Sequence, residues 1–284
     1  MTPCELIRQT AARFRSAGIP DPENDSALLL AHLTGGIPLA LRLDTDTVLE
    51  PSFLPLYEKL VRQRLSRIPL QYIIGEAPFC SRFFTVDPRV LIPRPETELL
   101  CYWAQEILEN IPHPRILDLC CGSGCIGLTL KAVRPDAAVT LSDLSADALA
   151  VAGENCRRLA LDVDLHQGDL LEGFPSSSFD HIVCNPPYIP SSDCAALQPE
   201  VLFEPRMALD GGTDGLDFYR RLISSAAVSL APGGTLLMEL GIYEADAVSD
   251  LLSASGYHHI QLRKDLSGID RMILGYTAGG LHAR

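Results

Sequence analysis

The stretch RILDLCCGSGCIGLTLKAV, residues 115–133, decides the fold that we predict for this chain. It begins with an apolar run at 115–119 that is typical of a buried strand, and a helical pattern follows at 124–133. Between them, Gly122 and Gly124 let a ligand approach the backbone, and the N-terminus of the helix supplies free N–H groups. A strand, a glycine turn and a helix in this order predict a nucleotide-ribose binding unit.

The segments after this unit continue to alternate between strand and helix patterns. Such alternation predicts a parallel sheet with helices on both faces. The last two strands flank a short turn at 266–268, so we expect a terminal hairpin whose final strand is antiparallel. The expected strands are 115–119, 139–142, 163–166, 180–185, 235–240, 258–264 and 270–277, and the expected helices are 124–133, 145–159, 215–231 and 243–255.

The tetrapeptide Asn185-Pro186-Pro187-Tyr188 follows the strand expected at 180–185. The two prolines end that strand, because proline cannot donate to a ladder, and they leave Asn185 at its carboxyl end. Asn185 and the Pro186 carbonyl offer two hydrogen-bond acceptors, and Tyr188 offers a flat aromatic face. Two hydrogen-bond acceptors beside an aromatic ring suit a planar NH2 group. We therefore expect Asn185, Pro186 and Tyr188 to be catalytic, and all four residues to bind substrate. A proline-rich turn with Asn as a cap is the alternative.

Acidic residues near other strand ends extend the predicted ligand site. Asp143 stands 21 residues after Gly122, at the end of the second strand of this unit, where it can accept both ribose hydroxyls. After the third strand, Asp169 could take the exocyclic amine of an adenine and Leu170 could pack on its ring. The turn lacks the three-glycine spacing of dinucleotide sites. These residues together therefore fit S-adenosylmethionine, with Asp118 near its methionine end.

The cysteines and histidines do not predict a metal site. Cys120, Cys121 and Cys125 lie close together, but no Cys-x-x-Cys spacing and no fourth ligand accompany them. The seven histidines are scattered along the chain, and we assign none of them a catalytic role. The nine cysteines also lack paired spacing, which indicates reduced thiols in a cytoplasmic protein.

Composition limits the class of protein. The 284 residues leave room for one large domain and a small one, and 47% of them are hydrophobic. No apolar run approaches the roughly 18–20 residues of a membrane-spanning helix, and the N-terminus lacks a signal pattern. The net charge of −13 argues against a broad phosphate-binding surface. Residues 1–70 hold 8 basic and 8 acidic side chains, so the net negative charge lies entirely in the rest of the chain.

Residues 4–67 have the pattern of three helices. One contains Leu6, Ile7, Ala11 and Phe14 at helical spacing and ends before Gly18. The second starts at Asp21-Pro22-Glu23 and ends at Gly35-Gly36, and the third covers 52–66, with Leu56, Leu60 and Leu65 expected to face inward.

Four basic residues mark the polar face of that third helix and its end. They are Lys59, Arg62, Arg64 and Arg67. They form either a solvated helix face or a docking surface for an acidic or nucleic-acid-bearing partner.

Residues 68–92 are rich in aromatic and β-branched side chains and predict a β-hairpin between two domains. The sequence Pro93-Arg94-Pro95-Glu96-Thr97-Glu98 then opens a helix that extends to about Leu108. Carboxylates in a first helical turn favour the helix dipole, and whether Glu96, Thr97 and Glu98 also shape a pocket stays open.

Three blocks of this chain resemble the HemK-like release factor glutamine methyltransferases. They are the tetrapeptide at 185–188 after a cofactor turn, LIPRPETE at 91–98 and FEPRMALDGG at 203–212. The helical region of about 75 residues in front is also similar. The resemblance implies an α/β, Rossmann-like class I methyltransferase fold with a mostly parallel seven-stranded sheet. It also implies an S-adenosylmethionine-dependent enzyme that converts the glutamine of the Gly-Gly-Gln motif of release factors to N(5)-methylglutamine.

The same resemblance implies binding positions and domains. The implied and expected cofactor residues are Asp118, Cys120, Cys121, Gly122, Ser123, Gly124, Asp143, Asp169, Leu170 and Asn185. The family turn usually begins with glycine where this chain has Cys120, and a side chain there should crowd the turn unless it points away from the ligand. We expect a helical substrate-docking domain at 1–75, a hairpin linker at 76–92 and a methyltransferase domain at 93–284. The sequence does not give the oligomeric state, and a monomer is the simplest expectation.

Three alternatives to this function stay open at this point. A DNA or RNA adenine amino-methyltransferase could use the same tetrapeptide to hold an exocyclic amine, although it would need basic and stacking surface around its cleft. A nicotinamide-dependent oxidoreductase would bind a nicotinamide cofactor. A binding module could keep the fold without catalysis.

Overall fold

The computed structural model describes residues 1–279, so the last five residues of the expected methyltransferase domain lie outside the described chain. The chain divides into two compact units. The first consists of Met1–Glu76 together with the short segment Gln198–Phe203. The second consists of Ala77–Leu197 and the chain from Glu204 onward. Among the described residues, no helix has the length and apolar character needed to cross a membrane.

The first unit is helical. Its helices are α1 (Pro3–Ser16), α2 (Pro22–Thr34), α3 (Pro38–Leu43), α4 (Phe53–Leu65) and α5 (Leu70–Ile74). The three helices expected from the sequence correspond to α1, α2 and α4. The sequence analysis missed α3 and α5, because helices of five or six residues are too short to show a periodic pattern.

Local signals explain where the long helices begin and end. Thr2 and Glu5 form a capping box at the start of α1, in which each side chain accepts a hydrogen bond from the backbone N–H of the other residue. Gly35 ends α2 in the left-handed conformation, with φ of 68°. The core of the unit contains Phe14, and Leu60 and Leu65 of α4 pack against it partly buried.

The inward face of α4 differs from the expected one at Leu56. That side chain is 55% exposed, whereas the buried residues of the helix are Tyr57, Val61 and Arg64. Tyr57 occupies the inner position because its ring is buried and its hydroxyl donates to the Ser26 carbonyl at 3.0 Å. The prediction for Leu56 was therefore wrong, since the buried stripe is set by these partners.

The prediction that Arg64 belongs to the polar face of this helix was also wrong. It is only 4% exposed, and its guanidinium donates to Asp25 Oδ2 at 2.7 Å and to Glu200 Oε1 at 2.8 Å. Arg67 donates to the other oxygen of Glu200 at 2.7 Å. Two of the four basic residues are therefore paired inside this unit, and only Lys59 and Arg62 stay exposed without a buried partner.

We expect Arg64→Met to lower the free energy of unfolding by about 3–5 kcal/mol, because it leaves the buried Asp25 carboxylate without its cation. Arg62→Met removes an exposed cation of the same helix and should change that free energy by less than about 0.5 kcal/mol. Urea unfolding followed by circular dichroism measures both variants. Equal unfolding midpoints for the two variants would contradict the structural importance of the buried pair.

The second unit contains a seven-stranded sheet in the order β5-β4-β3-β6-β7-β9-β8. The strands are β3 (Arg115–Leu119), β4 (Ala138–Asp143), β5 (Asp164–Gln167), β6 (Phe179–Cys184), β7 (Leu230–Glu239), β8 (His258–Lys264) and β9 (Asp270–Tyr276). Neighbours from β5 to β7 are parallel, and β9 is antiparallel to both β7 and β8. The expected mostly parallel sheet with an antiparallel last strand is confirmed.

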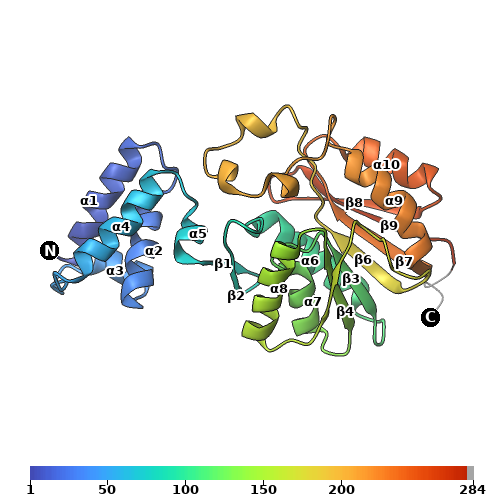
Figure 1. The fold of residues 1–284 in the computed structure, drawn as a ribbon, viewed down its shortest axis with the longest axis horizontal. Helices are drawn as coiled ribbons and strands as arrows, with labels where there is room; N and C mark the ends of the chain where they lie inside the picture. Colours follow the sequence, from blue (N-terminus) through green and yellow to red (C-terminus); the bar gives the residue numbers. More distant parts are fainter. Residues whose placement is uncertain (280–284) are drawn as a thin grey trace. The chain divides into compact units, whose positions relative to one another are not determined.

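Helices cover both faces of this sheet (Figure 1). They are α6 (Pro95–Leu108), α7 (Cys125–Val133), α8 (Ala146–Leu159), α9 (Asp217–Ser229) and α10 (Ala245–Ala254). Successive strand residues belong to different cores: Ile116 packs with α6, α7 and α8, and Leu117 packs with α9 and α10. Strand β3 is therefore buried on both faces, which explains its continuous apolar run.

The expected hairpin is present and shorter than its predicted range. It consists of β1 (Glu76–Phe79) and β2 (Arg82–Thr85), and its turn residues Cys80 and Ser81 both have positive φ. Glu98 Oε1 accepts the Cys80 N–H at 2.8 Å, which ties the turn to the first turn of α6. Residues 86–92 do not form a strand.

Candidate active site

The chain order within the sheet reverses between β3 and β6. From β3 the chain proceeds to β4 and β5 on one side, and β6 then returns to the other side of β3. In open parallel sheets, ligands bind in the crevice outside the carboxyl ends of the strands at such a point. The glycine turn leaves β3 here, and Asn185 leaves β6.

A cavity of about 340 Å³ lies at this edge. Six of the residues predicted to bind the cofactor line it, and so does Pro187 of the predicted substrate set. The six are Cys120, Gly122, Asp143, Asp169, Leu170 and Asn185. The cavity therefore brings together residues from the ends of four parallel strands.

The turn after β3 has positive φ at three alternate residues. Cys120, Gly122 and Gly124 all have positive φ, of 56°, 53° and 77°. A Cβ atom on Gly122 would meet nothing within 4 Å, so the cavity is open over this residue. A Cβ on Gly124 would instead lie 2.9 Å from Leu141 Cδ1, so this glycine is needed for packing.

Asp143 at the end of β4 is held toward this turn. Its Oδ2 accepts the Gly122 N–H and its Oδ1 accepts the Ser145 N–H, both at 2.9 Å. Burial raises the pKa of the Asp143 carboxyl above its ordinary value, although these amide hydrogen bonds oppose the shift. A carboxylate fixed at the edge of a cavity, beside an open glycine, is suited to bind the hydroxyls of a nucleoside.

Four predicted cofactor residues do not line the cavity. They are Asp118, Cys121, Ser123 and Gly124. Asp118 is fully buried, and its Oδ2 accepts the Gly127 N–H at 2.7 Å, so it fastens the turn to the first residues of α7. Within residues 1–279 its Oδ1 has no hydrogen-bond partner, and burial raises the pKa of this carboxyl well above its usual range.

Asp169 and Leu170 both line the cavity, and Asp169 has a second contact. Its Oδ2 accepts from Arg221 at 2.6 Å in an exposed ion pair. Leu170 has φ of 53°, which turns the chain sharply after β5. The two residues stay candidates for the base-binding end of the cavity.

The tetrapeptide at 185–188 is fixed by two different parts of the chain. Asn185 Nδ2 donates to Thr97 Oγ1 at 3.2 Å, and Tyr188 OH donates to Glu239 Oε1 at 3.4 Å. Neither Pro186 nor Tyr188 lines the cavity. Burial and the Glu239 carboxylate raise the pKa of Tyr188, so its phenol stays neutral near pH 7. Within residues 1–279, the Asn185 Oδ1 and the Pro186 carbonyl accept no hydrogen bond; Asn185 lines the cavity, whereas Pro186 is buried beside it.

The chain returns at 209–215 to pack against the tetrapeptide. Ile189 N donates to the Leu209 carbonyl at 2.9 Å, and Gly211 N donates to the Ile189 carbonyl at 2.8 Å. A Cβ on Gly211 would lie 2.7 Å from the Tyr188 Cα. Gly211 of the block at 203–212 is therefore required by the close approach of two backbones.

The sequence analysis missed several cavity residues. Residues 89–91, Met207, Asp210 and Phe218 also line the cavity. In the sequence, the only indication of these residues was that they belong to the blocks at 91–98 and 203–212 or lie close to them. Glu204 explains why both blocks are near the site, because its buried carboxylate accepts the Ile92 N–H at 3.0 Å and pairs with Arg94.

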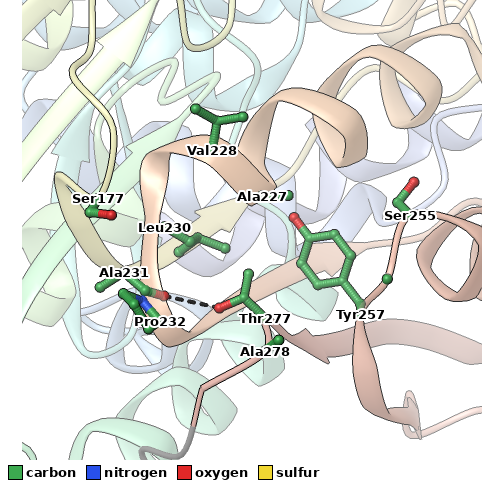
Figure 2. A pocket seen from close by; sticks show the side chains of 11 residues that line it. Ser177, Ala227, Val228, Leu230, Ala231, Pro232, Ser255, Tyr257, Thr277 and Ala278 are labelled. Carbon is green, nitrogen blue, oxygen red and sulfur yellow. Dashed lines mark hydrogen bonds between the residues drawn. The ribbon is translucent and has the colours of Figure 1, made fainter.

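A second cavity, of about 350 Å³, lies at the opposite edge of the sheet (Figure 2). It is lined by residues at the starts of β6 and β7 and at the end of β9. Among the described residues that line it, only Tyr257 has an ionisable side chain, and the Tyr257 hydroxyl donates to the Ile223 carbonyl at 3.2 Å. This cavity contains none of the predicted site residues, so the candidate active site is the one at the carboxyl edge.

Within residues 1–279, no group of three or more His, Cys, Asp or Glu side chains is arranged to hold a metal ion. The nine cysteines are free thiols.

Comparison with known proteins identifies relatives along almost the whole chain. A model of the methyltransferase small domain matches residues 103–212, and a model of the PrmC N-terminal domain matches residues 5–75. The release factor glutamine methyltransferase of Deinococcus radiodurans is 41% identical over 276 residues, which are 97% of this chain and 99% of that protein. The protein of the same name from Geobacter sulfurreducens is 42% identical over 95% of each chain.

A solved methyltransferase structure from Pyrococcus furiosus has the same fold. It aligns with a TM-score of 0.51 and 15% identity over 80% of this chain and 99% of that chain. Together with the sheet order, this likeness confirms the class I methyltransferase fold that the sequence predicts.

Gly127 of α7 and Gly153 of α8 allow a test of the packing behind the cavity. A Cβ on Gly127 would lie 2.3 Å from Leu141 Cδ2 and 2.9 Å from Asp118 Cβ, so Gly127→Ala should destabilise the fold by about 1–3 kcal/mol. Gly153 is inside α8 and has room for a Cβ, so Gly153→Ala should stabilise it by about 0.5–1 kcal/mol. Thermal unfolding shows whether each variant is more or less stable than the wild type. If the unfolding temperatures of both variants shift in the same direction, close packing against Leu141 does not require glycine at position 127.

Proposed function

Because the chain belongs to the family of the release factor glutamine methyltransferases, we propose that it methylates the glutamine side chain of the Gly-Gly-Gln motif of peptide chain release factors. The methyl donor is S-adenosylmethionine, and the product is N(5)-methylglutamine. The observation that carries this proposal is the place of Asn185, with its free Oδ1, in the same cavity that Gly122 and Asp143 line.

The cavity residues fit the proposed cofactor. Gly122 offers open space next to its backbone, and Asp143 offers a fixed carboxylate at the end of β4 for the ribose hydroxyls. Asp169 and Leu170 stand at the end of β5, where an adenine would lie. Asp118 does not line the cavity; its Oδ2 accepts the Gly127 N–H and so supports the turn from behind. When bound, S-adenosylmethionine supplies the electrophilic methyl group on its sulfonium sulfur.

The protein has to make a weak nucleophile react, because the lone pair of an amide nitrogen is delocalised. Asn185 Oδ1 and the Pro186 carbonyl would accept the two hydrogens of the substrate NH2 group and hold its plane. The Tyr188 ring would limit rotation of that plane. Holding a reactant in line in this way can supply up to about 7–11 kcal/mol of a barrier. Carbonyl dipoles aimed at the nitrogen also stabilise the positive charge that develops there.

The nitrogen gains one methyl group and must lose one proton, while the electron pair of the broken carbon–sulfur bond stays on sulfur. Neither acceptor needs to be a strong base, since the methylated amide nitrogen is acidic enough to release its proton to water. The tetrapeptide therefore acts by orientation and charge stabilisation.

The partner of the enzyme is a release factor, and the site of action is the cytoplasm, where free thiols are stable. The alternative of a DNA or RNA adenine amino-methyltransferase is not favoured, because the relatives with full-length similarity carry the release factor name and the net charge is −13. Of the basic residues considered for docking, only the exposed Lys59 and Arg62 remain candidates for contact with a partner.

The direct experiment mixes the protein with labelled S-adenosylmethionine and either a purified release factor or duplex DNA. Peptide mass spectrometry then locates the label. We expect it on the glutamine of the Gly-Gly-Gln motif. Label on adenine would retain the methyltransferase and replace the substrate, and absence of label from both would refute the proposed function.

We expect Asn185→Ala to lower kcat by about 100- to 1000-fold, because it removes an acceptor aimed at the reacting nitrogen. Its affinity for S-adenosylmethionine, measured by calorimetry, should change far less. Activity equal to that of the wild type would refute the proposed role of Asn185.

We expect Asp143→Ala to raise the KM for S-adenosylmethionine by about 10- to 100-fold, through loss of hydrogen bonds to a charged group. Asp162→Ala removes an exposed carboxylate from the loop before β5 and serves as the matched control. If both variants keep the wild-type KM, Asp143 is not the ribose ligand.

A further inference from the structure

Asn185 is connected to a buried carboxylate through a single hydroxyl group. Its Nδ2 donates to Thr97 Oγ1 at 3.2 Å, and Thr97 Oγ1 donates to Glu239 Oε2 at 2.6 Å. Thr97 is 3% exposed and Glu239 is 2% exposed. The three residues come from the end of β6, the first turn of α6 and the last position of β7. Tyr188 donates to the other carboxylate oxygen, at 3.4 Å, and so connects both ends of the tetrapeptide to Glu239.

The direction of these hydrogen bonds follows from the chemistry of the groups. An ionised carboxylate has only acceptor oxygens, so the single hydroxyl proton of Thr97 must point to Glu239. The lone pairs of Thr97 Oγ1 then face Asn185, and they can only be met by a donor, which is the NH2 group of its amide. The Asn185 Oδ1 is thereby turned away from Thr97 and left free at the cavity.

The opposite arrangement would block the site. If Glu239 were protonated it could donate to Thr97, and the Thr97 proton would then be free to meet Asn185 Oδ1. The amide of Asn185 would rotate and present its NH2 group to the cavity. A substrate NH2 group would then face a donor in place of an acceptor, which is an unpaired contact and not a hydrogen bond.

We propose that Thr97 and Glu239 are positioning residues that fix the polarity of the Asn185 amide, so that its oxygen and not its NH2 group meets the substrate amide. This inference rests on the proposed function, because it concerns the same methyl transfer. Neither residue touches the substrate, and both act through Asn185. It also gives Thr97 of the block at 91–98 a task other than helix capping.

The surroundings of Glu239 allow its charge to change near neutral pH. Burial raises its pKa to about 7, against the hydrogen bond from Thr97 and the cation of Arg271 on β9. Glu96 on α6 adds to the rise, and Tyr188 opposes it. From α9, the Tyr219 hydroxyl donates to the backbone carbonyl of Glu239 at 2.9 Å. Because the acceptor form is needed, kcat should be full above this pKa and should fall as the pH drops through it.

The first test compares two substitutions of Thr97. Thr97→Val keeps the shape and removes the hydroxyl, and we expect kcat to fall roughly 10- to 100-fold through misorientation of Asn185. The KM and the calorimetric Kd for S-adenosylmethionine should stay within about twofold, which also shows that the variant is folded. Thr97→Ser restores the hydroxyl and should recover most of the rate. A valine variant as fast as the wild type, or a serine variant as slow as the valine variant, overturns the proposal.

The second test uses pH. The wild-type kcat should decline as the pH is lowered from 8 to 6, below the pKa of about 7 of Glu239. Glu239→Gln removes the titrating group, so its kcat should be lower than that of the wild type at pH 8 and should show no further decline in this range. A variant that keeps the wild-type pH profile overturns the role of Glu239.

The wild-type enzyme, assayed on a purified release factor in the same experiments, separates this inference from the proposed function. Wild-type protein that leaves the Gly-Gly-Gln glutamine unmethylated refutes the proposed function, and the inference falls with it. Methylation by the wild type together with an unaffected Thr97→Val variant refutes the inference alone.

Discussion

The parallel pairing of β3 with β4 and with β6 is the constraint on which the rest of the second unit depends. It sends the chain out of three neighbouring strands at one edge of the sheet, where the glycine turn, Asp143 and Asn185 come together. Because β3 is buried on both faces, its register cannot slip without placing apolar residues in the wrong core.

Buried charged groups organise the structure around that edge. Glu204 joins the chain before α6 to the segment after the tetrapeptide, and Glu239 joins α6 to the tetrapeptide itself. In the first unit, Arg64 has the same kind of role toward Asp25 and Glu200. Each buried charge is costly to remove from water, and each is compensated by hydrogen bonds from elements far apart in the sequence.

Cys120 is the clearest departure of this chain from the family turn, in which glycine is usual. Its φ of 56° lies in the left-handed region, where a residue with a Cβ is strained by about 1–2 kcal/mol. The side chain lines the cavity and also packs against the core covered by α9 and α10, which offsets part of that strain. The family's preference for glycine at position 120 thus reflects backbone conformation. The cavity itself is open over Gly122.

The sequence by itself determined the alternation of strands and helices, the antiparallel last strand and the family, since periodicity, turns and short motifs are local signals. It also pointed to six residues that share the cavity, because residues that follow parallel strands must meet at one edge. Only the tertiary structure decided that Arg64 is buried, that Asp118 supports the turn from behind, and that Thr97 contacts Asn185. These facts depend on contacts between residues 9 to 136 positions apart, which no local pattern encodes.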